Sequence, residues 1–377
     1  MRTATTVPAP DAPAATLAAD TSGYVATVNL AAEATRSGFY DRAGQQHLAP
    51  LWRVLGGLVP DVPKPRAQPA LWRYADVRPF VLESCTQIST EEAERRVMVL
   101  ENPGLPGQSR ITQSLFAGLQ IILPGELAPA HRHTASALRF IIEGQDAYTA
   151  VAGEKTMMLP GDFVITPSMT WHDHGNIGDG PMVWLDGLDM HIVNFFDASF
   201  REGYPGEVQP LHRPEGAAMA ESGSNLLPID QQWGTLTSPI FNYPYHRTRE
   251  ALSQLQRFRP INAWHGHKMR YVNPVNGSWA MPTLATCMQL LPQGFETRPY
   301  RSTDSTVFTV VEGQGRSRIV TPAGEQVFDW GPHDIFVVPS WMTVTHSASA
   351  QGGDAVLFSY SDRAVQDKLD LFREEQL

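Results

Sequence analysis

The distribution of apolar and polar positions divides the chain into strand-rich and helical stretches. Between residues 95 and 200, and again between 281 and 361, short runs rich in Val, Ile, Leu and Phe alternate with polar residues and end at Gly or Pro. Such period-two runs predict β-strands, because successive strand side chains face opposite sides. The 30 Gly and 30 Pro among 377 residues also suit short strands joined by turns. We therefore predict a mainly β protein with two strand-rich units.

Helical patterns lie outside these two units. Apolar side chains recur at i, i+3, i+4 and i+7 within residues 27–58, and residues 248–257 and 363–377 are also amphipathic. A short helix is predicted at residues 89–93, where Ser and Glu three positions apart form a capping box. The C-terminal helix is expected to dock its apolar side on the core.

The remaining segments are predicted to form a tail, an extended connector, an arm and a linker. Residues 1–26 are rich in Ala, Pro and Thr and predict a disordered tail. Prolines recur through residues 59–69, and each biases its predecessor away from helix. Residues 71–79 are expected to form an arm that packs between domains. Residues 201–233 are rich in Gly, Pro, Glu and Ser and predict a linker or a long excursion.

Charge and cysteine content narrow the functional classes. The formal net charge of −10 argues against binding to nucleic acid or to an anionic membrane surface. No apolar run reaches membrane-spanning length, and the N-terminus lacks the apolar core of a signal peptide. The two cysteines, Cys85 and Cys287, are too few for a disulfide framework and lack metal-site spacing. We therefore expect a cytoplasmic protein with reduced thiols.

Two closely spaced histidine pairs are the main chemical signal. His131 and His133 form one pair, and His172 and His174 form the other. Residues two apart on a strand face the same side, so each pair can direct both imidazoles into one interior. A lone strand histidine is more often a hydrogen-bonded core residue. Two pairs within a Gly/Pro framework instead favour a site for Fe, Zn, Cu or Ni.

These histidines also belong to a longer pattern that resembles a known family. The pattern is the two-part cupin signature, carried here by Gly125, His131, His133, Gly144, Pro160, Gly161, Pro167, His172 and Asn176. The glutamate ligand that most cupins have is replaced by Ala137, so the resemblance implies a three-histidine site. The stretches LQIILPGELAPAHRHTASALRF and TWHDHGN resemble the gentisate 1,2-dioxygenase family, which includes relatives acting on salicylate and 1-hydroxy-2-naphthoate. The resemblance extends from about Leu48 to Asp362.

The family resemblance implies a bicupin, which consists of two double-stranded β-helix (jelly-roll) barrels. The implied organisation is a disordered tail (1–26), a helical and extended arm (27–94), a first barrel with the metal site (95–200), a linker with a helix (201–280), a second barrel (281–362) and a C-terminal helix (363–377).

The second barrel repeats the first but has lost its metal ligands. Gly294 aligns with Gly125, and Pro339 aligns with Pro167, which indicates duplication. The three ligand positions of the first barrel are occupied in the second by Tyr300, Ser302 and Val344, while His346 survives opposite His174. We therefore expect one metal ion per chain, held by the first barrel. The second barrel is expected to supply core or an oligomer surface.

Arg139 is a candidate for substrate binding. It lies two residues beyond Ala137 and hence on the same inward-facing side of its strand. A buried arginine is costly without a partner, and its planar fork suits a carboxylate. A structural ion pair is the alternative interpretation.

The resemblance implies the remaining pocket residues. The metal ligands are His131, His133 and His172, with His174 as the acid/base group beside them. Arg95 is preferred to Arg96 as a second arginine near the substrate carboxylate, and Asp186 is preferred to Asp189 at the far side of the ring. Further substrate contacts are assigned to Gln120, Phe116 and Gly118.

Three neutral imidazoles leave a divalent ion its full charge and several open positions, which favours a chelating ortho-hydroxycarboxylate. The resemblance implies Fe(2+)-dependent cleavage of gentisate with O2 to maleylpyruvate, in a homo-oligomer that is a tetramer in the family. Salicylate or 1-hydroxy-2-naphthoate are alternative substrates. A non-catalytic bicupin that binds a metal or a small acid remains a further alternative.

Overall fold

A computed structural model describes residues 30–230 and 236–377, so the predicted tail at 1–26 lies outside the described residues. The chain divides into two compact units between Asp61 and Val62. The described part of the first unit contains α1 (Leu30–Gln45) and α2 (Leu51–Leu58), where the sequence predicts helix. The described residues include no helix long and apolar enough to cross a membrane.

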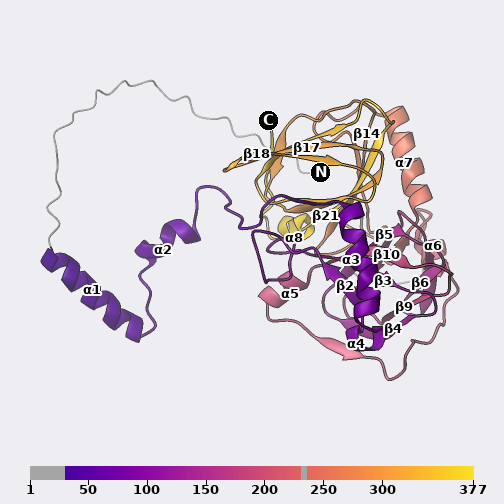
Figure 1. Cartoon of the computed structure of the whole chain (residues 1–377), viewed down its shortest axis with the longest axis horizontal. Coiled ribbons are helices and arrows are strands. Elements are labelled where there is room, and N and C mark those ends of the chain that lie inside the picture. The colour runs from indigo at the N-terminus through magenta and orange to yellow at the C-terminus, as the bar shows by residue number, and fades with distance from the viewer. Residues whose placement is uncertain (1–29, 231–235) are drawn as a thin grey trace. The chain divides into compact units, whose positions relative to one another are not determined.

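The second unit contains two β-barrels, each built from a pair of sheets (Figure 1). In the first barrel, the sheet β12-β8-β5-β10-β3-β2 faces the sheet β11-β4-β9-β6-β7. Its strands are β2 (Arg96–Val99), β3 (Phe116–Ile122), β4 (Leu127–His133), β5 (Ala137–Glu143), β6 (Ala147–Val151), β7 (Glu154–Met158), β8 (Phe163–Thr166), β9 (His172–Asn176), β10 (Met182–Leu188), β11 (Arg201–Gly203) and β12 (Asn242–Tyr243). Its short helices are α4 (Thr90–Ala93), α5 (Met190–Phe195) and α6 (Ala217–Ser222).

The second barrel has the same construction. The sheet β1-β19-β16-β21-β14-β13 faces the sheet β18-β17-β20-β15-β22. Its elements are β1 (Ala70–Trp72), β13 (His267–Arg270), β14 (Ala285–Leu291), β15 (Tyr300–Ser302), β16 (Thr306–Glu312), β17 (Gly315–Thr321), β18 (Gly324–Trp330), β19 (Ile335–Val338), β20 (Thr343–Ala348), β21 (Ala355–Ser361), α8 (Arg363–Lys368) and β22 (Glu374–Gln376). The prediction of a mainly β bicupin is confirmed.

Strand register shows that the duplication is structural. His131 on β4 pairs with His172 on β9, and Tyr300 on β15 pairs with Val344 on β20. The loop positions correspond as well, because Gly125 and Gly294 both have a φ above +70°, which favours glycine. The residues that replace the ligands therefore occupy the same barrel positions as the ligands.

The repeated unit begins earlier in the sequence than the predicted barrels. Each repeat starts with a strand that pairs with the sheet of the other barrel. β1 precedes the first barrel in sequence but pairs with β19 of the second, whereas β12 pairs with β8 of the first. Each strand leads into a helix of equal length, α3 (Tyr74–Gln87) and α7 (Tyr245–Phe258). The backbone N–H of Tyr74 donates to Asp334 and that of Tyr245 donates to Asp162, both at 2.8 Å.

Three predictions about helices and arms can be compared with these elements. The capping box is confirmed, since the Ser89 hydroxyl accepts the Glu92 N–H at the start of α4. The helix expected at 248–257 is confirmed as part of α7. The arm expected at 71–79 comprises the end of β1 and the start of α3, because α3 begins at Tyr74 and continues through Pro79. The buried Tyr74 and Val81 anchor this helix despite the donor lost at the proline.

The C-terminal helix predicted for 363–377 is wrong in its second half. The helix α8 ends at Lys368, and Glu374–Gln376 form β22, which pairs with β15. Leu369 and Leu371 are more than half exposed, so they do not dock on the core as expected. Pairing with a free sheet edge outweighs the local helical pattern. The equivalent strand of the first barrel is β11, which pairs with β4.

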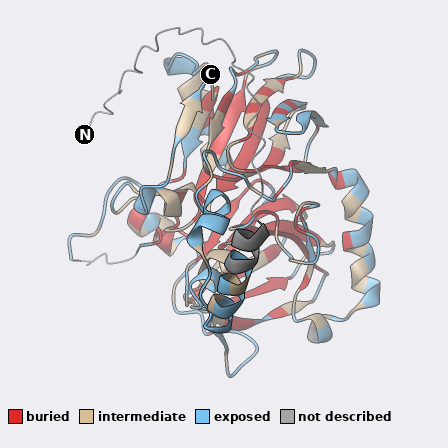
Figure 2. Ribbon diagram, turned by 90° about the vertical axis from the view of Figure 1, so that its left-hand side faces the viewer, coloured by how far each residue is buried: buried red, intermediate tan, exposed pale blue. Residues whose placement is uncertain are grey.

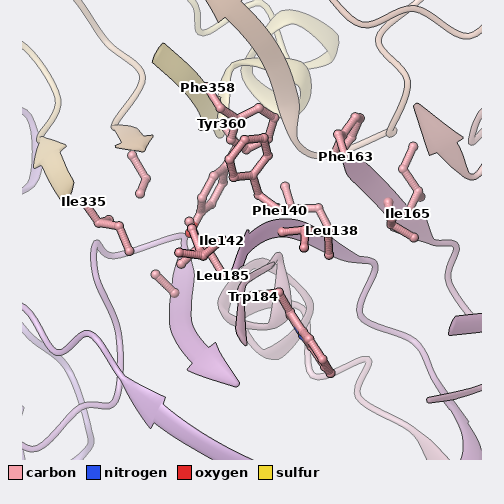
Figure 3. Close-up of a cluster of buried hydrophobic side chains, with 14 of the residues drawn as sticks. Leu138, Phe140, Ile142, Phe163, Ile165, Trp184, Leu185, Ile335, Phe358 and Tyr360 are labelled. Carbon is pink, nitrogen blue, oxygen red and sulfur yellow. The ribbon is translucent and has the colours of Figure 1, made fainter. Parts of the chain in front are cut away.

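The main core is continuous across both barrels. Buried residues concentrate on the strands of both barrels (Figure 2), and one hydrophobic cluster contains side chains from each. Phe140 and Phe358 stack at 4.2 Å between ring centroids (Figure 3). A Cβ on Gly187 would lie 2.8 Å from the ring of Tyr360, so glycine allows this close approach. The two barrels therefore share one hydrophobic core.

Candidate metal centre

The four predicted histidines meet between the two sheets of the first barrel. His131 and His133 project from β4, and His172 and His174 project from the neighbouring strand β9. One ligand atom from each of His131, His133 and His172 lies within 4.8 Å of the others. The ring centroids of His131 and His172 are 4.2 Å apart. The strand alternation used in the sequence prediction therefore brings three imidazoles together.

Backbone carbonyls orient these three imidazoles. The Nδ1 atoms lie 3.2 Å from the Pro129 carbonyl for His131, 2.7 Å from Ala135 for His133 and 3.0 Å from Thr170 for His172. An Nδ1–H that donates to a carbonyl fixes the tautomer and leaves Nε2 free to bind a metal, as the geometry at His133 and His172 allows. The Nε2 atom of His172 is buried and has no hydrogen-bond partner in the described chain.

Burial also keeps these histidines neutral. It lowers the pKa of His131 to about 3, with the nearby Arg95 charge adding to the effect. Burial likewise lowers the pKa of His133, and it lowers that of His172 well below its ordinary value. Neutral imidazole is the form that ligates metals. The donor set therefore fits a divalent transition metal held by three protein nitrogens.

His174 lies beside this group but outside it. Its side chain is fully buried, and neither ring nitrogen has a hydrogen-bond partner in the described chain. Its ring lies 5.8 Å from that of His172 and 5.7 Å from that of Trp184, measured between centroids. A buried polar group without a partner is costly, so both nitrogens are available to an incoming molecule.

The opposite sheet carries a buried pair of charges. Strand register places Asp186 between Arg139 on β5 and Gly118 on β3. The Arg139 Nε lies 3.7 Å from Asp186 Oδ1, and its Nη1 donates to Thr166 at 2.5 Å. Burial raises the pKa of Asp186 to about 6, although the Arg139 charge opposes this rise. The structural ion pair considered for Arg139 is thus present, with Asp186 as its partner.

Two residues that support this pair were not predicted from sequence. The Trp184 indole N–H donates to Asp186 Oδ1 at 3.0 Å, and the Thr166 hydroxyl accepts from Arg139. The i, i+2 spacing of Trp184 and Asp186 on one strand was a usable signal for the first contact. Thr166 lies 27 residues from Arg139 in sequence and is brought to it only by the pairing of β5 and β8.

Arg95 and Arg96 have different surroundings. The Arg95 Nη2 lies 2.6 Å from His131 Nδ1 and donates to the Pro129 carbonyl at 3.0 Å. Arg96 is buried and forms an ion pair with Glu126. Burial, together with the Arg139 charge, lowers the pKa of Arg95 to about 10. Arg95 is therefore the arginine that reaches the histidine group.

Comparisons with known proteins agree with this geometry. The family model for the cupin domain matches residues 118–188. Gentisate 1,2-dioxygenase 1 of Aquipseudomonas alcaligenes is 53% identical over 90% of this chain and 96% of its own. The chain belongs to the gentisate 1,2-dioxygenase family. Salicylate 1,2-dioxygenase from Pseudoaminobacter salicylatoxidans, solved as an adduct with gentisate, is a structural relative within this group. It is 32% identical with a TM-score of 0.84, and the match covers 94% of this chain and 96% of that chain.

Comparison of the two repeats distinguishes an aspartate with a structural role from an aspartate that only the first barrel has. Asp189 accepts the Ser136 N–H, and its repeat equivalent Asp362 accepts the Ser305 N–H. The aspartate that ends each repeat's last core strand thus supports the same turn in both barrels. Asp186, by contrast, is replaced by Ser359 at the equivalent position. This comparison favours Asp186 over Asp189 as the site residue.

The remaining predicted substrate contacts lie on β3. Phe116, Gly118 and Gln120 alternate along this strand and are all buried. A Cβ on Gly118 would lie 2.5 Å from Val97 Cγ1, so the wall at this point accepts no side chain without repacking. Gln120 pairs across the sheet with Trp184. The three residues therefore share a face with the Asp186 side of the site.

Proposed function

We propose that this protein is an Fe(2+)-dependent gentisate 1,2-dioxygenase, which cleaves the ring of 2,5-dihydroxybenzoate with O2 to give maleylpyruvate. The observation that carries the proposal is the neutral three-histidine group facing the Arg139–Asp186 pair. The Aquipseudomonas relative named for this activity supports the choice of substrate.

The metal is proposed to be iron, bound by His131, His133 and His172. Iron would supply the redox chemistry that allows O2 to react with an electron-rich ring. Three neutral ligands leave the ion its full charge, which suits a substrate that binds through a carboxylate and an adjacent hydroxyl.

The protein residues are proposed to position the substrate and to move protons. Arg139 and Arg95 neutralise the carboxylate, because both are cationic and flank the histidine group. His174 serves as the acid/base group, since its unpartnered nitrogens can hydrogen-bond the reacting hydroxyl. Asp186 accepts a hydrogen bond from the hydroxyl that gentisate has and salicylate lacks. Phe116, Gly118 and Gln120 bound the ring.

The alternative is a salicylate or 1-hydroxy-2-naphthoate 1,2-dioxygenase built on the same metal site. The salicylate 1,2-dioxygenase structure supports this alternative at 32% identity, below the 53% of the gentisate relative. A non-catalytic bicupin is supported less, because an unpartnered buried histidine beside the metal group suits proton transfer.

Relative activity on gentisate and salicylate tests the substrate assignment. A site that hydrogen-bonds a hydroxyl loses about 1–3 kcal/mol when that hydroxyl is missing. We therefore expect kcat/KM to be at least about tenfold higher for gentisate than for salicylate. Faster turnover of salicylate would reject gentisate as the substrate.

We further propose that the enzyme is a cytoplasmic homo-oligomer, and a tetramer by family resemblance. Both cysteines, Cys85 and Cys287, are free thiols, as a reducing compartment requires. In the first unit, Leu51, Trp52 and Leu55 of α2 are exposed, as expected of a surface that another copy covers.

A further inference from the structure

The second barrel contains a cavity of about 660 Å³ that reaches two of the three positions equivalent to the metal ligands. Tyr300 and Ser302, which replace two of the metal ligands, line this cavity, as does Ser359, which replaces Asp186. The volume lies within the range of small-molecule binding sites, about 300–1,000 Å³. The repeat has therefore lost the ligands and contains a space where a small molecule can bind.

This cavity is rich in positive charge, although the chain has a net charge of −10. Its lining includes four cationic side chains and two carboxylates; the cations are Arg259, Lys268, Arg270 and Arg363. Neither carboxylate forms an ion pair with these cations within the described ranges, because Asp304 accepts from Ser302 and Glu374 faces His265. Burial lowers the pKa of His265, which favours its neutral form.

Comparison of the repeats shows that two of these cations are specific to the second barrel. Lys268 on β13 pairs with Gln289, whereas Val97 on β2 pairs with the equivalent Gln120. Arg270, two residues further along the same face, likewise corresponds to Val99. Two apolar positions of the first barrel have thus become lysine and arginine in the second.

Three of these cations lie around the same cavity residue, Cys287. The Cys287 thiol lines the cavity, and burial raises its pKa. The charges of Lys268, Arg363 and Arg270 all act to lower this pKa. Like charges gathered around one cavity repel one another, and an anion bound among them would relieve this repulsion. Of these three, only Arg363 has an ion-pair partner in the described chain, Asp367 at 3.7 Å.

An aromatic surface accompanies the charge. The Trp279 indole lies in the lining, with the guanidinium carbon of Arg270 at 5.3 Å and that of Arg363 at 5.7 Å from its centroid. Planar guanidinium groups bind carboxylates in a forked geometry, and an indole packs against another ring. We infer that the second barrel binds an aromatic carboxylate at a non-catalytic site formed by Lys268, Arg270, Arg363 and Trp279.

Anaerobic calorimetric titration of the iron-loaded enzyme with gentisate tests this inference, because turnover cannot occur without O2. We expect two sites per chain, one in each barrel. The variant K268Q/R270Q should weaken the second site by about tenfold or more and leave the first site and kcat/KM unchanged. The matched control R298Q/R318Q removes two cations of the second barrel that do not line the cavity, and it should keep both sites.

Two further readouts make the result decisive. Quenching of tryptophan fluorescence by gentisate at the second site should be lost in Trp279→Phe, and benzyl alcohol, which lacks the carboxylate, should not bind there. A single site that persists in K268Q/R270Q would overturn the inference, as would equal binding of benzyl alcohol. A single site that disappears in K268Q/R270Q would support this inference while rejecting gentisate binding in the first barrel.

Discussion

Replacing Asp186 by asparagine isolates the charge of the buried Arg139–Asp186 pair. The amide oxygen can still accept the Trp184 indole N–H, so the substitution preserves shape and one hydrogen bond. It leaves Arg139, which is 3% exposed, without its carboxylate partner. Asp186 is mostly ionised at pH 7 because its pKa is about 6.

The expected cost follows from the geometry. At the observed 3.7 Å, two unit charges attract by about 4–5 kcal/mol at an effective dielectric constant of about 20. Breaking a buried pair by removing one partner costs about 3–5 kcal/mol, because the remaining charge is uncompensated. We therefore expect Asp186→Asn to lower the free energy of unfolding by about 3 kcal/mol or more. Arg139→Met should cost less, because the remaining carboxyl can take up a proton.

Urea unfolding of the two single variants and the double variant measures this coupling. The double variant should be more stable than the sum of the single effects predicts, by about 2–4 kcal/mol. The gentisate-to-salicylate ratio of kcat/KM should fall in Asp186→Asn, whereas Arg139→Met should impair both substrates. Additive stability effects, with an unchanged substrate ratio, would refute both the coupling and the proposed role of Asp186.

Three other substitutions test separate parts of the structure. His174→Ala should keep its iron but lose about 10²–10⁴-fold in kcat, as expected for an acid/base group, and loss of iron would instead make it a ligand. His133→Ala should lose iron, whereas the native enzyme should contain one ion per chain by metal analysis; two ions would place a second metal outside the first barrel. Burial lowers the pKa of His346 to about 3. Just below pH 6.5 this histidine therefore takes up a proton only in the unfolded state, and the stability of the protein decreases as the pH falls. Between pH 7 and pH 5, the free energy of unfolding of His346→Gln should therefore decrease by about 2 kcal/mol less than that of the native protein. Equal decreases, measured by urea unfolding, would contradict this.

The metal group was predictable because its information is local. The spacing within each histidine pair depends only on strand alternation. The pairs themselves meet because β4 pairs with β9, although β5 to β8 lie between these strands in sequence. The loss of ligands in the second barrel was predictable for the same reason, since Tyr300 and Val344 are placed by an equivalent pairing.

The contact between Arg139 and Asp186 could not be predicted from spacing. No repeated motif links these two residues, and they meet only because β10 inserts between β5 and β3. The exchanged strands β1 and β12 were missed for a similar reason, because each pairs with the barrel that it does not precede. Strand β22 was hidden by a helical pattern that pairing with β15 overrides.

Oxygen uptake by iron-reconstituted protein on addition of gentisate tests the central claim most directly. If the three-histidine group of the first barrel holds the catalytic iron, one O2 should be consumed per gentisate. The same assay on folded His172→Ala, treated identically, should show no uptake above background. No uptake by the native protein, or undiminished uptake by His172→Ala, would contradict the account.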